Sequence, residues 1–141
     1  MFEVIGKDAL AAGAYSVVGI LLMMLGFVVV DLLTPGKLPV LIWQQRNRNA
    51  AILTASSLLG VGLIVCAAIN ASEGDLGNGL LGTALYSLIG LAAMAVAFLI
   101  IDLLTPGRLG DALADAQPHP AVWVQSVLHL AIAAIVAVSL L

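Results

Sequence analysis

The sequence predicts an all-α integral membrane protein with four transmembrane helices, arranged as two parallel two-helix repeats. Composition is the first observation behind this prediction. Hydrophobic residues make up 62% of the chain and charged residues only 9%, against roughly 45–50% and about 25% in soluble domains. Because a short chain cannot bury that much apolar surface in a water-soluble core, we expect its surroundings to be lipid. The second observation is an internal repeat.

The repeat is carried by one motif that occurs twice. Residues 31–38 read Asp-Leu-Leu-Thr-Pro-Gly-Lys-Leu, and residues 102–109 read Asp-Leu-Leu-Thr-Pro-Gly-Arg-Leu, so only the basic residue differs. Self-similarity at a constant spacing identifies two copies of one structural unit. We expect the first two-helix repeat at residues 1–72 and the second at residues 73–141.

Four apolar runs predict the transmembrane helices, at about residues 9–33, 49–71, 79–104 and 121–141. Each run has about the 20 residues that a helix needs to cross the hydrocarbon, and none shows the short alternating segments of a β-barrel. The first run is interpreted as a helix rather than a signal peptide. It is too long for the apolar region of a signal, and the third run copies it.

The distribution of Lys and Arg predicts the orientation. Lys37, Arg46 and Arg48 follow the first helix and Arg108 follows the third, whereas the opposite side carries only Lys7. Because cytoplasmic loops are enriched in Lys and Arg, we expect both Thr-Pro-Gly loops in the cytoplasm and both termini outside the inner membrane. The two repeats then share one orientation, unlike the inverted repeats of many transporters.

The repeated motif is the main candidate site. Its proline ends the helix, its glycine accepts a left-handed turn, and its basic residue suits the negative helix C-terminus. The aspartate opposes that dipole, so we expect a nearby Lys or Arg as its partner. The alternative is that the two aspartates lie together in the membrane and share a proton or hold a cation. The motif positions are Asp31, Thr34, Pro35, Gly36, Lys37, Asp102, Thr105, Pro106, Gly107 and Arg108.

Two polar residues of the fourth helix, Gln125 and His129, are further candidates. They are four residues apart and so share one helix face, with His129 expected at membrane depth. We favour an interhelical hydrogen bond from His129 to Thr54 or Ser57 of the second helix. The alternative is a polar relay formed by Asp31, Asp102, Gln125 and His129, in which the histidine passes protons to Asp102.

Small residues on the second helix predict close helix packing. Ala51 and Ala55 are four residues apart, as are Ser56 and Gly60. Small residues at this spacing let helix backbones approach, within one chain or between chains. Two copied units offer more such faces than four helices need internally. We therefore expect a homo-oligomer, for example a dimer.

Several function classes are disfavoured. A net charge of −3 provides no basic surface for nucleic acid. The single cysteine, Cys66, allows no intrachain disulfide or cysteine-based metal cluster, and the glycines form no phosphate-binding pattern. The two histidines and eight acids suggest no catalytic set. We predict no enzyme, cofactor or metal site; the expected partners are the lipid bilayer, further copies of the chain, and a cytoplasmic protein at the Thr-Pro-Gly loops.

The doubled motif, with Asn47-Arg48-Asn49-Ala50-Ala51 at the start of the second helix, resembles the bacterial "domain of unknown function 350" membrane family. The resemblance covers nearly the whole chain. It implies a small four-helix inner-membrane protein with no established activity to carry over, from a family often associated with envelope or membrane-stress gene sets. The second copy departs from the pattern, because Pro118-His119-Pro120-Ala121 stands where Asn47-Arg48-Asn49-Ala50 stands in the first.

Two functional hypotheses remain open. The first is an oligomeric membrane or scaffold component, linked to envelope stress, that presents its cytoplasmic loops to partners. The alternative is an oligomeric proton or small-cation channel or transporter that uses the intramembrane Asp, Gln and His residues. Four helices with few polar residues do not easily enclose a pore, so conduction would need several chains.

Overall fold

The computed structural model describes residues 2–72, 74–107 and 109–141. These residues form long helices with the bounds α1 (Phe2–Leu33), α2 (Arg48–Ala71), α3 (Leu76–Leu104) and α5 (Pro120–Leu140). All four are long and apolar enough to cross a membrane, which confirms the predicted fold class. A short π-helical segment, η1 (Val40–Gln44), precedes α2, and the short helix α4 (Leu109–Ala114) precedes α5.

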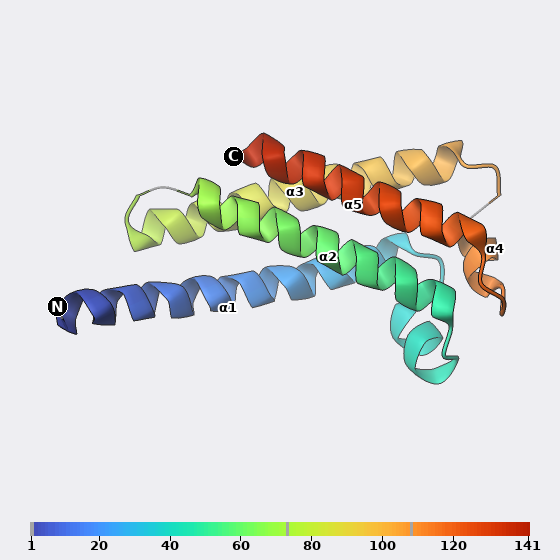
Figure 1. Ribbon diagram of the computed structural model, residues 1–141, viewed down its shortest axis with the longest axis horizontal. Helices are drawn as coiled ribbons and strands as arrows, with labels where there is room; N and C mark the ends of the chain where they lie inside the picture. Colours follow the sequence, from blue (N-terminus) through green and yellow to red (C-terminus); the bar gives the residue numbers. More distant parts are fainter. Residues whose placement is uncertain (1, 73, 108) are drawn as a thin grey trace.

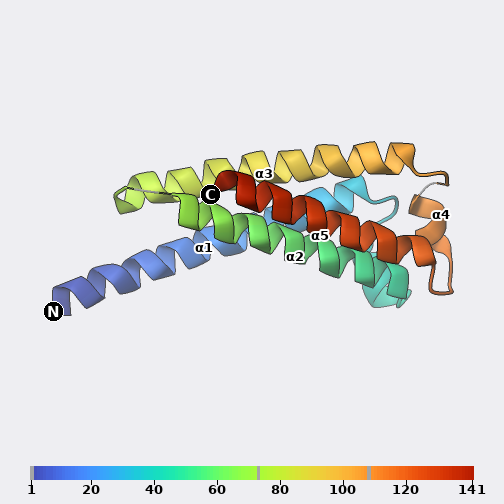
Figure 2. The same cartoon turned by 45° about the horizontal axis from the view of Figure 1, so that its top comes forward.

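The helices run alternately up and down along one long axis (Figures 1 and 2). Both chain termini and the α2–α3 connection lie toward one end. Both Thr-Pro-Gly turns, η1 and α4 lie toward the other, which we call the loop end. As a result, α1 and α3 run in one direction and α2 and α5 in the other. The division into repeats at residues 1–72 and 73–141 stays a prediction.

Glycines allow α2 to pack closely against its neighbours. A Cβ added at Gly60 of α2 would lie only 2.8 Å from the Cβ of Ala133 on α5, and one added at Gly26 of α1 would lie 2.6 Å from a methyl group of Val61 on α2. These helix crossings therefore have no room for a side chain. Close backbone approach increases the van der Waals contact that holds helices together in lipid.

The predicted packing residues of α2 separate into two groups. Ser56 and Gly60 are buried inside the bundle, where Gly60 faces α5. Ala51 is half-buried and Ala55 is exposed. The Ser56–Gly60 pair thus packs within the chain, while Ala55 faces outward.

The first helix extends well beyond its predicted span. It begins at Phe2 rather than near residue 9, because residues 2–8 contain charges but no proline that would stop a helix. Its 32 residues span about 48 Å, against about 30 Å of hydrocarbon. Residues 3–10 are exposed, and the N-terminal half of α1 diverges from the other helices (Figure 1).

Candidate functional site

The two Thr-Pro-Gly turns have the same geometry. Asp31 Oδ1 accepts a hydrogen bond from the backbone N–H of Leu38 at 2.7 Å, and Asp102 Oδ1 accepts one from the N–H of Leu109 at 3.3 Å. The glycines adopt the left-handed conformation expected of them, with φ of 99° at residue 36 and 95° at residue 107. Each turn therefore brings the chain back so that a backbone amide faces the aspartate.

This partner differs from the one that the sequence suggested. We expected Lys or Arg, but among the described residues Asp31 and Asp102 accept hydrogen bonds from backbone N–H groups beyond the turn, and the pairing of Asp102 with Arg108 stays a prediction. An N–H donor is the partner that an ionised carboxylate needs, and it offsets the unfavourable helix dipole. Lys37 is exposed. Arg108, the basic residue of the second motif, lies outside the described residues.

The start of α2 holds the connection between α4 and α5. Asn49 is almost fully buried, with 3% of its surface exposed. Its side chain has four hydrogen-bond contacts with the backbone of α4 and of that connection. The two N–H groups of Nδ2 are shared among the carbonyl oxygens of Ala112 at 3.1 Å, Asp115 at 3.2 Å and Gln117 at 2.9 Å, and Oδ1 accepts from the N–H of His119 at 3.1 Å. One side chain of the first repeat thus holds the loop of the second.

Asn47 adds a local cap and a long-range contact. Its Oδ1 accepts from the N–H of Ala50 at 3.0 Å and caps α2, and its Nδ2 donates to the carbonyl oxygen of Leu113. The second copy uses His119 instead, whose Nδ1 accepts from the N–H of Ala121 at 3.2 Å and caps α5. Asparagine at a helix start predicts a cap, but no sequence signal identified the second contact of Asn47 or the role of Asn49.

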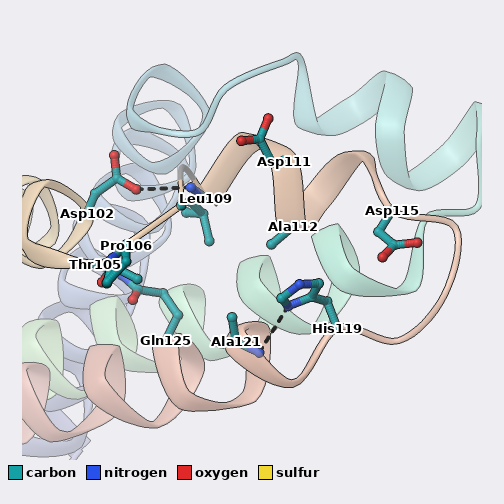
Figure 3. Close-up of a pocket in the computed structure, with 11 residues that line it drawn as sticks. Asp102, Thr105, Pro106, Leu109, Asp111, Ala112, Asp115, His119, Ala121 and Gln125 are labelled. Atoms are coloured by element: carbon teal, nitrogen blue, oxygen red, sulfur yellow. Dashed lines mark hydrogen bonds between the residues drawn. The ribbon is translucent and has the colours of Figure 1, made fainter.

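A pocket of about 200 Å³, the loop-end pocket, opens between the end of α3, α4 and the start of α5 (Figure 3). It brings together Asp102 and Gln125, two of the four residues proposed for a polar relay. Asp31 is not among the described residues that line it. The lining residues are Asp102, Thr105, Pro106, Gly107, Leu109, Asp111, Ala112, Asp115, His119, Ala121 and Gln125.

The fourth relay candidate, His129, lies one helical turn deeper on α5 and is 1% exposed. The structure pairs its Nδ1 with Ser57 Oγ at 3.1 Å, and Ser57 is one of the two partners that we expected. Because the Ser57 hydroxyl donates to the carbonyl oxygen of Leu53 at 2.8 Å, it accepts from Nδ1–H. The neutral imidazole then keeps its lone pair at Nε2. Phe98 of α3 stacks on the ring, with centroids 4.8 Å apart.

Unpartnered polar atoms surround this pair. In the described part of the chain, the buried atoms without a hydrogen-bond partner are Thr54 Oγ1, Ser87 Oγ, Gln125 Nε2 and Ser126 Oγ. Three of the four lie within about one turn of Ser57 or His129. A buried polar group without a partner is costly, so we expect water or a bound molecule beside them.

Apolar side chains follow His129 toward the termini. Beyond His129, toward the termini, the interior is closed by buried apolar side chains: Val61, Ile64, Leu91, Met94 and Ala133. The arrangement therefore connects a pocket at the loop end with a buried histidine, and an apolar layer separates both from the opposite end. Buried polar side chains occur again nearer the termini, at Thr83 and Ser87 of α3.

We predict that Asn49→Ala destabilises the loop end. The variant leaves several buried backbone groups without a partner, which costs about 1–3 kcal/mol. The melting temperature in detergent should fall and proteolysis between residues 114 and 119 should accelerate. Asn70→Ala is the control, because Asn70 is exposed on the same helix. Equal stability and equal proteolysis of the two variants would contradict the assigned role of Asn49.

Comparison with known proteins agrees with this architecture. Residues 4–140 match the family model described as "Domain of Unknown Function (DUF350)". A UPF0719 transmembrane protein of Mycolicibacterium paratuberculosis is 35% identical over 131 residues, which cover 93% of this chain and 87% of that protein. A UPF0719 transmembrane protein of Mycobacterium bovis is 37% identical over 126 residues, which cover 89% and 83%. No solved structure matches the chain.

These matches run through all four membrane-spanning helices and both Thr-Pro-Gly turns. The coverage includes both repeated motifs and the Asn47 and Asn49 positions at the start of α2. The chain therefore belongs to the DUF350 family, a family of small transmembrane proteins for which no activity is established.

Proposed function

We propose that the protein is a homo-oligomeric structural component of the bacterial inner membrane that presents a platform to a cytoplasmic protein. The platform consists of η1, α4 and the two Thr-Pro-Gly turns. The observation that carries the proposal is the side chain of Asn49, whose four hydrogen-bond contacts tie the α4–α5 connection to α2. A connection that only links two helices needs no such support, because ordinary loops are mobile.

The exposed surface of the platform supports its role in binding. Trp43 of η1 is 69% exposed, and tryptophan is common at the level of the lipid headgroups. Arg46 and Arg48 beside it are exposed, as are Asp111 and Asp115 at α4. A rigid surface with both signs of charge suits a protein partner. The association of the family with envelope-stress gene sets favours a partner from the envelope-stress response. No catalytic role forms part of the proposal.

We propose that the platform lies in the cytoplasm, because Lys37, Arg46 and Arg48 adjoin it and Lys7 is the only base near the other end. A reporter fused after Leu141 should then be active only if it functions outside the inner membrane. Alkaline phosphatase, which needs the periplasm, and green fluorescent protein, which needs the cytoplasm, form a matched pair. Fluorescence without phosphatase activity would overturn the orientation.

Two small exposed residues in the N-terminal half of α1 support the proposal that the protein assembles into oligomers. Ala9 and Gly13 are four residues apart and both are exposed, and a Cβ added at Gly13 would meet no atom within 4 Å. This spacing allows close approach of another helix. Because this half of α1 diverges from the rest of its own chain (Figure 2), we propose that a second copy packs there.

We predict that Gly13→Leu converts the oligomer to a monomer without lowering the melting temperature. Leucine at this position hinders only a neighbouring chain, whereas Gly60→Leu, the comparison variant, clashes with Ala133 inside the bundle and should cost about 1–3 kcal/mol of stability. Native mass spectrometry in mild detergent measures the first effect, and thermal unfolding measures the second. Wild-type protein that is monomeric at every concentration would refute assembly.

A second candidate function is the conduction of protons or small cations. It is favoured by the unpartnered Nε2 of Gln125 at the loop-end pocket, by the unpartnered hydroxyl of Thr54 and by the lone pair of His129. The apolar layer beyond His129 argues against it in the present conformation. The structural proposal predicts no ion flux in liposomes at any pH between about 5 and 8, the range in which histidine titrates. A pH-dependent flux that is lost in Gln125→Leu would favour conduction instead.

A further inference from the structure

We infer that the loop-end pocket binds a small protonated amine that also carries an oxygen atom, the chemistry of ethanolamine. The inference rests on the loop-end pocket, which shares α4 and the second Thr-Pro-Gly turn with the platform, and it requires neither a protein partner nor oligomerisation. It depends on one buried carboxamide, one carboxylate of the repeated motif and the excess of negative charge around them.

Gln125 provides the polar group at the inner side of the pocket. Only 6% of its surface is exposed, yet its Nε2 has no hydrogen-bond partner among the described residues. Figure 3 shows its carboxamide extending from α5 toward Thr105 and Pro106, on the side of the pocket where Asp102 lies. A carboxamide offers two N–H donors and one carbonyl acceptor. A ligand oxygen that accepts from Nε2 removes the cost of this unpartnered donor.

Asp102 provides the charge. Its Oδ1 accepts from Leu109 N–H, and this hydrogen bond leaves the second oxygen for a donor. Thr105 is similar, because its hydroxyl donates to the carbonyl oxygen of Ile101 at 2.7 Å and its lone pairs can still accept. An ammonium group has three donors and no acceptor, so these two oxygens are suitable acceptors for it.

The negative charge around the loop-end pocket favours a cation even when Asp115 is left out of the count. Asp115 also lines a neighbouring pocket with Arg46 and Arg48, so we assign it to those arginines. Asp102 and Asp111 remain at the loop-end pocket. The sequence adds one basic residue beside this turn, Arg108, and a single positive charge cannot balance two carboxylates. His119 adds no charge in its capping role, because Nδ1 accepts a hydrogen bond there.

An organic cation fits better than a bare metal ion. The described residues contain no group of three or more His, Cys, Asp or Glu that could hold a metal, and Figure 3 shows the carboxylates of Asp102, Asp111 and Asp115 apart from one another. Hard cations such as Ca²⁺ need about six to eight oxygen ligands. The volume of about 200 Å³ far exceeds the roughly 30 Å³ that one water occupies in the liquid, so a molecule of several heavy atoms fits.

Two sources can supply this chemistry: free ethanolamine and the headgroup of phosphatidylethanolamine. The pocket lies where α3 ends and α5 begins, which is the level expected for lipid headgroups. Titration calorimetry on protein in nanodiscs of phosphatidylglycerol alone tests the free amine. Native mass spectrometry of protein extracted from membranes that also contain phosphatidylethanolamine tests the lipid.

The experiment compares wild type with Gln125→Leu, Asp102→Asn and the matched control Asp31→Asn. Wild type should bind ethanolamine, or retain phosphatidylethanolamine, and should not bind uncharged ethylene glycol. Gln125→Leu and Asp102→Asn should each weaken binding about tenfold, since a hydrogen bond to a charged group is lost. Asp31→Asn changes the equivalent turn, which does not line this pocket, and should bind as wild type does.

Gln125→Leu keeps the test interpretable, because it removes a buried unpartnered amide and should not lower the melting temperature. Binding in the calorimetric arm supports the free amine, and retention in the mass-spectrometric arm supports the lipid. No binding in either arm would overturn the inference. So would equal binding by wild type and folded Gln125→Leu, or a loss in Asp31→Asn as large as that in Asp102→Asn.

Discussion

The absence of water inside the bilayer is the constraint on which this structure depends. Helices satisfy their own backbone groups, and the polar side chains among them must find partners from the same chain. Ser57 pairs with His129 across α2 and α5, and Asp31 pairs with a backbone amide beyond its turn. Exceptions are therefore informative: among the described residues Gln125 Nε2 and Thr54 Oγ1 have no hydrogen-bond partner, and they mark the region where water or a ligand is expected.

Duplication followed by divergence accounts for the asymmetry of the loop end. Both copies keep the Asp-Leu-Leu-Thr-Pro-Gly turn, but only the first keeps Asn47 and Asn49, whose side chains reach into the second copy. The two turns also have different neighbours, because Pro35 of the first turn lies against Gly110 of α4, whereas Asp102 of the second lines a pocket. The same Asp-Leu-Leu-Thr-Pro-Gly sequence thus meets α4 in one copy and lines a pocket in the other.

The proposals concern different parts of the chain. The platform depends on the connection that Asn49 holds, the oligomer depends on the N-terminal half of α1, and amine binding depends on Asp102 and Gln125. The first and the last are adjacent, because Asn49 hydrogen-bonds to the backbone of Ala112, Asp115 and His119, which also line the loop-end pocket. Because distant sites act nearly additively, variants in the N-terminal half of α1 can be interpreted separately from those at the loop end. Conduction, in contrast, requires the apolar layer around Ile64 and Met94 to open.

The sequence by itself determined the class of protein, the four spans and the two turns, because hydropathy and Pro-Gly chemistry are local properties. Spacing also indicated Ser57 as a partner for His129. Tertiary structure alone decided that the aspartates bind backbone amides, that Asn49 holds the second repeat, and that Asp102 but not Asp31 meets Gln125. The sequence prediction placed the start of α1 near residue 9 rather than at Phe2, because charged residues mark where the hydrocarbon ends and not where a helix begins. The physical reason for these limits is that long-range contacts depend on how helices cross, and crossing depends on close packing at positions such as Gly60, which composition does not encode.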